Sequence, residues 1–258
     1  MKYYCGIDIG SSTTKAVLID AEKNILSKSL LPTGYDVEKV CEEVFEMVLE
    51  RAGVKGNEVS KIVSTGYGRF RAKFAHKNVT EITCHAKGAL HVFPGTRTII
   101  DIGGQDSKAI SVDEKGKVID FAMNDKCAAG TGRFLENMAR VLQTDLEEMG
   151  RIASSARESV KITSTCTVFA ESEVISLIHQ GKSRESIISG LFEAIVLRVI
   201  PLATRVGLKK ELTLTGGVAK NKGIISAFRK IVGFEVNLPD DPQVIGAFGA
   251  ALIAAEED

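Results

Sequence analysis

The feature that most constrains the fold of this chain is an internal repeat. The segment IDIGSSTTKAVLID begins at Ile7, and the segment IDIGGQDSKAISVD begins at Ile100, 93 residues later. The two segments align without a gap and share seven of their fourteen residues. Each copy is typical of an apolar strand that ends in aspartate, a glycine turn and a second strand. One large offset indicates a duplicated lobe rather than a solenoid, whose repeats are shorter and more numerous.

The repeat divides the chain into two expected lobes. We expect a first lobe over residues 1–95, completed by a C-terminal helix over 243–258, and a second lobe over 96–242. A further short strand is predicted after each copy, in NILSKSLL and in KVIDFAM. Apolar residues at helical spacing predict helices at 36–52, 132–142, 145–153, 171–180 and 184–206, and from about residue 221. The sequence therefore predicts an α/β protein.

Composition and charge narrow the classes of partner. Lys plus Arg and Asp plus Glu both number 33, so the 258-residue chain has no net charge and lacks the basic footprint of a nucleic-acid binder. No signal-peptide core or uninterrupted membrane-length apolar run is visible, so we expect no membrane contact. The five cysteines are scattered and odd in number, which argues against a disulfide framework. These features predict a cytoplasmic protein.

Three glycine turns follow apolar strands, in DIGSST, DIGGQD and LTGGVAKN. Glycine allows an anion to approach the backbone N–H groups closely, and small polar residues add donors. Asp8 and Asp101, at the ends of the repeat strands, can orient waters around Mg²⁺ between two phosphate-binding hairpins. Lys15 either approaches a phosphate or lies on the surface.

Two cysteines stand out from the other three. Cys127, in NDKCAAGTGRF, and Cys166, in STCTVFAESEV, each precede a predicted helix by a few residues. The positive potential of a helix N-terminus favours a thiolate or a thiolate-bound iron–sulfur cluster. Two ligands are too few for a cubane cluster, but a twofold homodimer would supply four. Cys5 and Cys41 are expected in the core, whereas Cys84, placed ahead of a helix, is left open.

The paired DIG hairpins and the late TGG turn resemble the actin, sugar kinase and heat-shock chaperone ATPase superfamily. The resemblance implies two lobes of ribonuclease H type around a cleft that binds ATP or ADP with Mg²⁺. It assigns residues 8–15 and 101–106 to two phosphate loops and residues 215–221 to the adenosine side. Gln105 either orients the attacking water or caps a turn. The expected nucleotide-binding residues are Gly10, Ser11, Ser12, Thr13, Thr14, Lys15, Gly103, Gly104, Gln105, Gly216, Gly217, Val218, Asn221 and Gln243.

A more specific resemblance rests on NDKCAAGTGRF, STCTVFAESEVISLI, STGYGR, IDIGGQD and LTGGVAKN. Together these segments are similar to the ATP-dependent activators of (R)-2-hydroxyacyl-CoA dehydratases, a pattern shared by the ATPase subunits of benzoyl-CoA reductase. This resemblance implies a homodimer with one [4Fe–4S] cluster held by Cys127 and Cys166 of both subunits. It further implies an anaerobic, ATP-driven transfer of a single electron to a partner dehydratase, with ferredoxin or flavodoxin as the reductant.

Other functions are open to the same fold. A small-molecule kinase, of the amino-sugar type, would need a sugar pocket with a general base, and the sequence identifies no such base. A filament-forming or chaperone-like ATPase would leave Cys127 and Cys166 without a role. If the chain is such an activator, its partner is a dehydratase, a benzoyl-CoA reductase or a double-cubane cluster protein.

Overall fold

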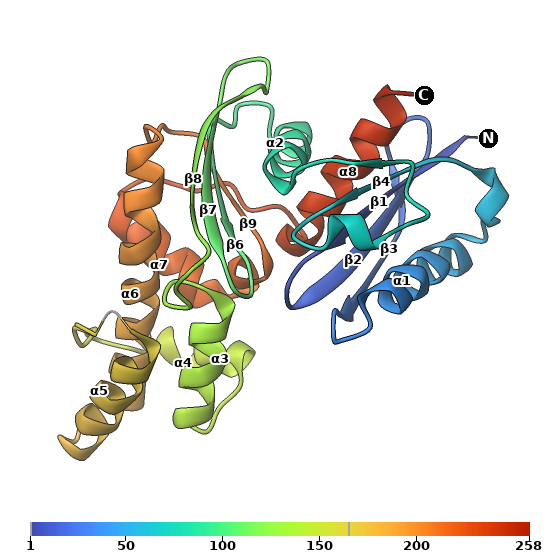
Figure 1. Cartoon of the computed structure of the whole chain (residues 1–258). Helices are drawn as coiled ribbons and strands as arrows, with labels where there is room; N and C mark the ends of the chain where they lie inside the picture. Colours follow the sequence, from blue (N-terminus) through green and yellow to red (C-terminus); the bar gives the residue numbers. More distant parts are fainter. Residues whose placement is uncertain (1, 165) are drawn as a thin grey trace. The chain divides into compact units, whose positions relative to one another are not determined.

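The computed structural model describes residues 2–164 and 166–258. The chain divides into two compact units. Unit 1 comprises the residues up to 96 together with 112–119 and 239–258, and unit 2 comprises 97–111 and 120–238. Each unit contains the start of one copy of the repeat, and Figure 1 shows that each contains its own sheet.

Unit 1 is built on a five-stranded sheet in the order β3-β2-β1-β4-β5. The central strand β1 is antiparallel to β2 and parallel to β4. Its strands are β1 (Tyr3–Ile9), β2 (Thr13–Ile19), β3 (Ile25–Pro32), β4 (Val59–Thr65) and β5 (Lys77–Asn78). Its helices are α1 (Val37–Ala52), α2 (Glu81–Val92) and α8 (Ile245–Glu256), with short 3-10 turns at Gly56–Glu58, Arg69–Arg71 and Pro242–Val244.

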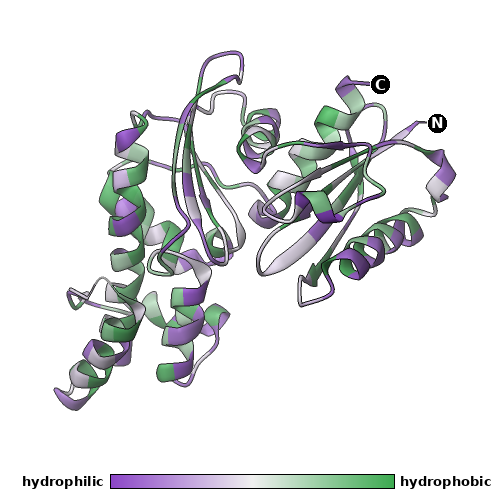
Figure 2. Cartoon of the chain, in the orientation of Figure 1, coloured by the Kyte–Doolittle hydropathy of each residue, from purple (hydrophilic) through white to green (hydrophobic). Residues whose placement is uncertain are grey.

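The C-terminal helix α8 is apolar on all sides and lies in the core of unit 1 (Figure 2). Its small residues allow the backbones of neighbouring elements to approach it. A Cβ atom at Gly249 would lie 1.8 Å from the carbonyl oxygen of Cys84 in α2, and one at Gly6 in β1 would lie 1.9 Å from the carbonyl oxygen of Ala247. The string GAFGAALIAA is therefore explained by close packing of α8 against α2 and β1.

The second sheet has the order β8-β7-β6-β9. Its central strand β6 is antiparallel to β7 and parallel to β9. Its strands are β6 (Thr98–Ile102), β7 (Ser107–Val112), β8 (Val118–Asn124) and β9 (Leu212–Thr215). The helices of unit 2 are α3 (Gly132–Val141), α4 (Leu146–Ala153), α5 (Thr167–His179), α6 (Arg184–Arg205) and α7 (Lys222–Val232), with a 3-10 turn at Gly217–Lys220.

The two sheets confirm the duplication predicted from the repeat. In each, the order is third strand, second strand, first strand and then a parallel strand from later in the chain. The register is also the same, because Asp8 faces Lys15 across the first hairpin and Asp101 faces Lys108 across the second. The third strands predicted after each copy are present as β3 and β8.

Helix α6 is long and apolar enough, by length and composition alone, to cross a membrane. Its apolar side chains are instead used within unit 2. Ile187, Leu191, Ile195 and Val199 are fully buried in the main hydrophobic cluster of that unit. We therefore describe α6 as the central core helix of unit 2.

Two local expectations differ from the structure. Helix α5 begins at Thr167, directly after Cys166, whereas the sequence predicted its start near residue 171. The β-branched and aromatic residues of its first turn have weak helix propensity and conceal the start. Cys84 lies inside α2 rather than ahead of it, because the Thr80 side chain caps this helix by accepting a hydrogen bond from the Thr83 backbone N–H.

Candidate functional site

The first glycine turn places a buried ion pair at its base. Lys15 Nζ lies 3.0 Å from Asp8 Oδ2, and both side chains are almost fully buried. The Gly10 backbone N–H closes the turn on the Thr13 carbonyl oxygen over 3.0 Å. Lys15 is therefore buried in β2 beside the turn, and the surface alternative is wrong.

The predicted phosphate-binding residues lie along this turn. Ser11 is exposed at its tip, while the Ser12 hydroxyl oxygen is buried and has no hydrogen-bond partner in the described part of the chain. A buried hydroxyl without a partner carries a desolvation cost unless a ligand satisfies it. Thr14 is already engaged, since its hydroxyl lies 3.0 Å from the Thr33 hydroxyl. The turn thus has free hydroxyl donors at its tip, and the Asp8–Lys15 ion pair and the Gly10–Thr13 hydrogen bond hold it in place.

The second glycine turn repeats this arrangement with one more carboxylate. Lys108 Nζ lies 3.4 Å from Asp101 Oδ2 and 2.9 Å from Asp106 Oδ2. The Gly103 backbone N–H closes the turn on the Asp106 carbonyl oxygen over 2.9 Å. Gln105 is exposed between them. Asp101 is further fixed because the Thr215 hydroxyl donates to its Oδ1 over 3.0 Å.

The parallel strand beside each aspartate ends in the same pair of residues. Thr65 pairs with Asp8, Thr215 pairs with Asp101, and a glycine with φ of +89° follows each threonine. A Cβ atom would lie 2.5 Å from Asp8 Oδ1 at Gly66 and 2.8 Å from Asp101 Oδ1 at Gly216. Only glycine adopts this conformation at such close approach to a carboxylate.

Sequence reasoning did not assign Thr65, Gly66 or Lys108 to the site. The lysine lies at the equivalent position of the repeat, and STGYGR and LTGGVA share a Thr-Gly pair at a strand end. The alignment of the repeat is the signal that finds Lys108, and its extension to the later Thr-Gly pairs finds Thr65 and Gly66.

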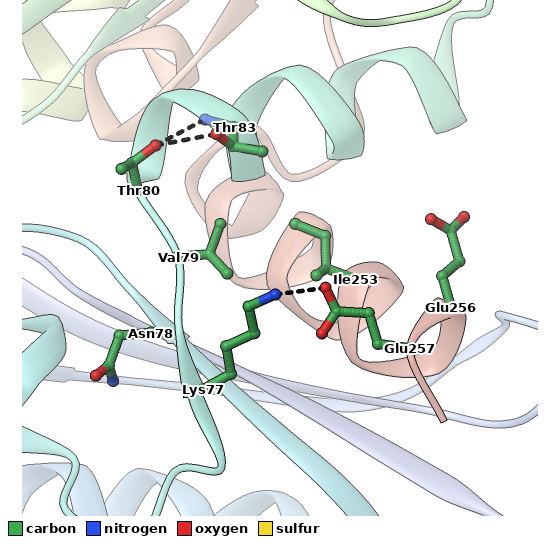
Figure 3. A pocket seen from close by; sticks show the side chains of 8 residues that line it. All are labelled: Lys77, Asn78, Val79, Thr80, Thr83, Ile253, Glu256 and Glu257. Carbon is green, nitrogen blue, oxygen red and sulfur yellow. Dashed lines mark hydrogen bonds and ion pairs between the residues drawn. The ribbon is translucent and has the colours of Figure 1, made fainter.

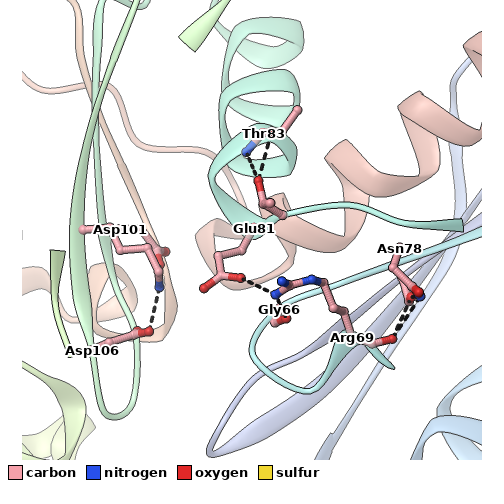
Figure 4. A network of polar contacts seen from close by, with 10 residues as sticks. Gly66, Arg69, Asn78, Glu81, Thr83, Asp101 and Asp106 are labelled. Carbon is pink, nitrogen blue, oxygen red and sulfur yellow. Dashed lines mark hydrogen bonds and ion pairs between the residues drawn. The ribbon is translucent and has the colours of Figure 1, made fainter. Parts of the chain in front are cut away.

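A polar network holds the turn that contains Gly66 (Figure 4). Arg69 Nη1 donates to the Gly66 carbonyl oxygen over 3.2 Å and lies 3.8 Å from the Glu81 carboxylate at the start of α2. The Asn78 side-chain amide donates to the Arg69 carbonyl oxygen over 3.2 Å. This arginine of STGYGR is therefore a positioning residue for the glycine turn.

The expected adenosine-side residues follow β9. Gly217 and Val218 begin the 3-10 turn after Gly216. The Asn221 side-chain amide donates to the Leu146 carbonyl oxygen over 2.6 Å, and its oxygen accepts from the Gly223 backbone N–H over 2.9 Å. Asn221 is thus engaged as the cap of α7.

Gln243 was also expected on the adenosine side. It lies in unit 1, in the 3-10 turn ahead of α8, and is half-buried. It has a polar contact within this chain.

Cys127 lies in an exposed loop that leads to α3. The Asn124 side chain shapes this loop, because its amide donates to the Cys127 carbonyl oxygen over 2.8 Å and its oxygen accepts from the Cys127 backbone N–H over 3.2 Å. The buried Thr131 hydroxyl then donates to the Ala128 carbonyl oxygen over 2.6 Å. The thiol itself is exposed.

The first turn of α3 is hydrogen-bonded directly to the second glycine turn. The backbone N–H groups of Gly132 and Arg133 donate to the carbonyl oxygens of Gly103 and Gly104, each over 2.9 Å. These are two of the donors that a helix N-terminus leaves without a partner in its own helix. The start of α3, five residues after Cys127, is therefore tied to the second glycine turn.

Cys166 is the N-terminal cap residue of α5 and is exposed. The residues just before it are held by Glu173, which accepts from the backbone N–H groups of Thr163 and Ser164 over 2.8 Å each. Burial raises the pKa of Glu173, but these and the accompanying side-chain hydrogen bonds outweigh it and lower the pKa to about 2. Glu173 is thus a charged anchor for the Cys166 segment.

The remaining cysteines are buried and unsuited to act as ligands. Burial raises the pKa of Cys41 to about 11 and that of Cys84 to about 12, and it raises the pKa of Cys5 further. These thiols stay protonated at neutral pH, which places Cys84 with the core thiols. Within residues 2–164 and 166–258, no three His, Cys, Asp or Glu side chains gather as a metal site.

A surface pocket in unit 1 lies apart from the residues of the two glycine turns (Figure 3). It is lined by the ends of β5, α2 and α8. Its charged groups are paired, because Lys77 lies 2.6 Å from Glu257 and Glu256 lies 2.7 Å from Lys87. No residue of either turn lines it.

Residues 5–254 match the model of the BadF/BadG/BcrA/BcrD ATPase family. The chain belongs to this ATPase family. The activator of lactoyl-CoA dehydratase from Anaerotignum propionicum is 48% identical over 98% of both chains. Several relatives of this chain are thus activators of 2-hydroxyacyl-CoA dehydratases, and the resemblance predicted from the sequence is confirmed.

Solved structures confirm the fold of this family member. Component A of (R)-2-hydroxyglutaryl-CoA dehydratase from Acidaminococcus fermentans is 41% identical with a TM-score of 0.96, covering 100% of this chain and 99% of that one. The 2-hydroxyisocaproyl-CoA dehydratase activator of Clostridium difficile, solved with bound ADPNP, is 42% identical with a TM-score of 0.94, covering 99% and 95%. The ROK hexokinase of Thermus thermophilus, at 17% identity and a TM-score of 0.53 over 99% of this chain and 98% of that one, shows the fold alone. The actin and sugar-kinase type of ATPase fold is therefore confirmed.

Proposed function

We propose that this ATPase uses ATP hydrolysis to drive a single electron onto a 2-hydroxyacyl-CoA dehydratase. The named activities of the relatives support this proposal, since they are activators of lactoyl-CoA, 2-hydroxyisocaproyl-CoA and (R)-2-hydroxyglutaryl-CoA dehydratases. A reduced ferredoxin or flavodoxin supplies the electron and is oxidised, and the dehydratase is reduced. Each ATP is consumed with one water to give ADP and phosphate.

The observation that carries the proposal is the bond between α3 and the second phosphate turn. Gly132 and Arg133 hydrogen-bond to Gly103 and Gly104, and Cys127 lies only a few residues before them. A turn that contacts a γ-phosphate changes its position when that phosphate is lost. The same change then reaches the Cys127 segment, which couples the state of the nucleotide to the thiol.

We assign a [4Fe–4S] cluster to Cys127 and Cys166 of two copies of the chain. Both thiols are exposed and both stand before helices, whereas Cys5, Cys41 and Cys84 are buried. The positive potential at a helix N-terminus favours thiolate ligands and the negative charge of a cluster. Two thiolates per chain match a cubane when a twofold homodimer supplies four. When bound, this cluster supplies the one-electron redox chemistry of the protein.

The nucleotide roles follow from the two turns. Residues 10–15 and 103–106 grip the phosphates through backbone N–H groups and hydroxyls, and the buried Ser12 hydroxyl gains an acceptor there. Asp8 and Asp101 would hold Mg²⁺ through water, with their lysine partners fixing both carboxylates. The exposed Gln105 orients the attacking water. Residues 216–221 and Gln243 form the adenosine side.

A benzoyl-CoA reductase component is the second candidate partner. One subunit of the benzoyl-CoA reductase of Thauera aromatica is 34% identical over 99% of this chain and 94% of that protein. The same ATPase cycle serves either partner, because substrate choice then lies with the acyl-CoA-binding component.

The test mixes the anaerobically reduced protein with a dehydratase component or a benzoyl-CoA reductase component. We expect one of the two components to convert its acyl-CoA substrate when ATP is present but not when ADPNP replaces it. A kinase of the same fold would behave differently, because an amino sugar would accelerate ATP consumption and become phosphorylated. Phosphorylation of a sugar with no activation of either component would contradict the proposal.

A further inference from the structure

Arg198 lies in the middle of the core helix α6, yet its guanidinium serves residues outside that helix. One of its terminal nitrogens, Nη2, donates to the carbonyl oxygen of Ser164, two residues before Cys166. Glu173 holds the same segment from α5 through the Thr163 and Ser164 backbone N–H groups. The residues just before Cys166 are thus held by the positive side chain of Arg198 and the negative side chain of Glu173.

The Cys127 segment passes over the same arginine. A Cβ atom at Gly130, where φ is +91°, would lie 3.4 Å from the Arg198 Cβ atom. Next along the chain, the Phe134 ring of α3 lies under the guanidinium, 5.3 Å from ring centroid to Cζ. A guanidinium over an aromatic face gains a cation–π contact. Arg198 therefore contacts both the segment that follows Cys127 and the segment that precedes Cys166.

The guanidinium also keeps donors unused. Its Nε and Nη1 atoms are buried and have no hydrogen-bond partner in the part of the chain that the structure describes. Burial lowers the pKa of Arg198 below its usual value, while the negative charge of the Glu173 carboxylate opposes this shift. An arginine remains charged in proteins even so. Arg198 thus combines a positive charge and buried, unpaired donors with contacts to Ser164 and Phe134.

We infer that Arg198 is a positioning residue for the cluster: it holds the Cys127 and Cys166 segments to α6 and raises the reduction potential of the cluster with its positive charge. The inference rests on the proposed function. A reduced cluster carries one more negative charge than an oxidised one, so a nearby cation stabilises the reduced form. The unpaired N–H groups are donors suited to negatively charged sulfur.

The test measures the reduction potential of the cluster in the anaerobically purified dimer by redox titration followed by electron paramagnetic resonance. Arg198→Met removes the charge and the donors, Arg198→Gln removes the charge but keeps a donor for Ser164, and Arg198→Lys keeps the charge. We expect the reduction equilibrium of the Met and Gln variants to become about tenfold less favourable, a fall of about 59 mV for one electron. The Lys variant should stay near the wild-type potential while losing iron faster to a chelator.

Arg205→Met is the matched control, since Arg205 is exposed near the end of the same helix and should leave the potential unchanged. If the Met variant does not fold, the comparison of Gln with Lys decides. Equal potentials in the wild type, Gln and Lys proteins would overturn the inference and leave the proposed function standing. Wild-type dimer without iron would overturn both.

Discussion

The backbone N–H of Gly132 donates to the carbonyl oxygen of Gly103 over 2.9 Å, which joins the helix after Cys127 to the second glycine turn. The space around Gly132 is tight. A Cβ atom there would lie 3.3 Å from the Gly103 oxygen, 3.3 Å from Gly104 Cα and 3.5 Å from Val218 Cγ2. The start of α3 is therefore packed against both glycine turns of unit 2.

Gly132→Ala should weaken the coupling between nucleotide and thiol. The added methyl group presses on the turn, so we expect ATP-dependent activation of the partner to fall about fivefold or more. Iron content should remain at the wild-type level, because neither cysteine is altered. Arg140→Ala, on the exposed last turn of α3, is the control and should retain full activation. Equal activation by Gly132→Ala and wild type would show that α3 does not transmit the state of the turn.

Lys108→Met should damage both stability and ATP hydrolysis. Lys108 and Asp101 have side-chain exposures of 5% and 4%, so the substitution leaves a buried carboxylate without its cation. Such a loss costs about 3–5 kcal/mol of unfolding free energy. Urea denaturation measures it, with the exposed Lys117→Met as control. A loss no larger than that of the control would mean that Asp101 is not held by this lysine.

Gly216→Ala should lower the unfolding free energy by more than the loss of a glycine in the left-handed conformation alone explains. Gly216 has φ of +89° and a Cβ atom there would lie 2.3 Å from the Ile102 carbonyl oxygen. Gly207 has φ of +77° but open space around it, so Gly207→Ala isolates the conformational cost of about 1–2 kcal/mol. In urea denaturation we expect Gly216→Ala to lose more unfolding free energy than Gly207→Ala. We also expect it to bind nucleotide more weakly. Equal costs for the two variants would remove the evidence for close packing at this turn.

Glu173 should make the stability of the protein depend on pH at the acid end. Its pKa falls from 4.5 to about 2 on folding, so its stabilising effect is fully present above pH 4.5 and is lost as the pH falls toward 2. The difference in unfolding free energy between wild type and Glu173→Gln should be about 1 kcal/mol at pH 7, since the carboxylate is partly exposed. The difference should disappear near pH 2. A difference in unfolding free energy that stays the same from pH 7 to pH 2 would contradict the lowered pKa of Glu173.

The sequence was most informative where the contacts are local. The two hairpins and their aspartates could be predicted because a strand, a turn and a second strand lie within fourteen residues. The pairing of β1 with β4 and of β6 with β9 joins residues far apart in the chain, so Thr65 and Gly66 were not assigned to the site. Burial of Lys15 also depends on such long-range packing.

Helix boundaries and side-chain clamps were harder to predict for other reasons. The first turn of α5 contains Val168 and Phe169, whose helix propensity is weak, so the cap position of Cys166 was not visible. Arg198 lies in an apolar helical pattern, where a single arginine reads as an interruption. Its role depends on Ser164 and Phe134, which only the folded chain brings to it.

Iron content of the anaerobically purified dimer tests the central claim most directly. We expect about four iron atoms per dimer and the electron paramagnetic resonance signal of a reduced [4Fe–4S] cluster. Cys127→Ser and Cys166→Ser should each lose the iron while still binding ATP, and Cys41→Ala, a change in the buried core, should keep it. An iron-free wild-type protein, or full iron content in either serine variant, would contradict the account.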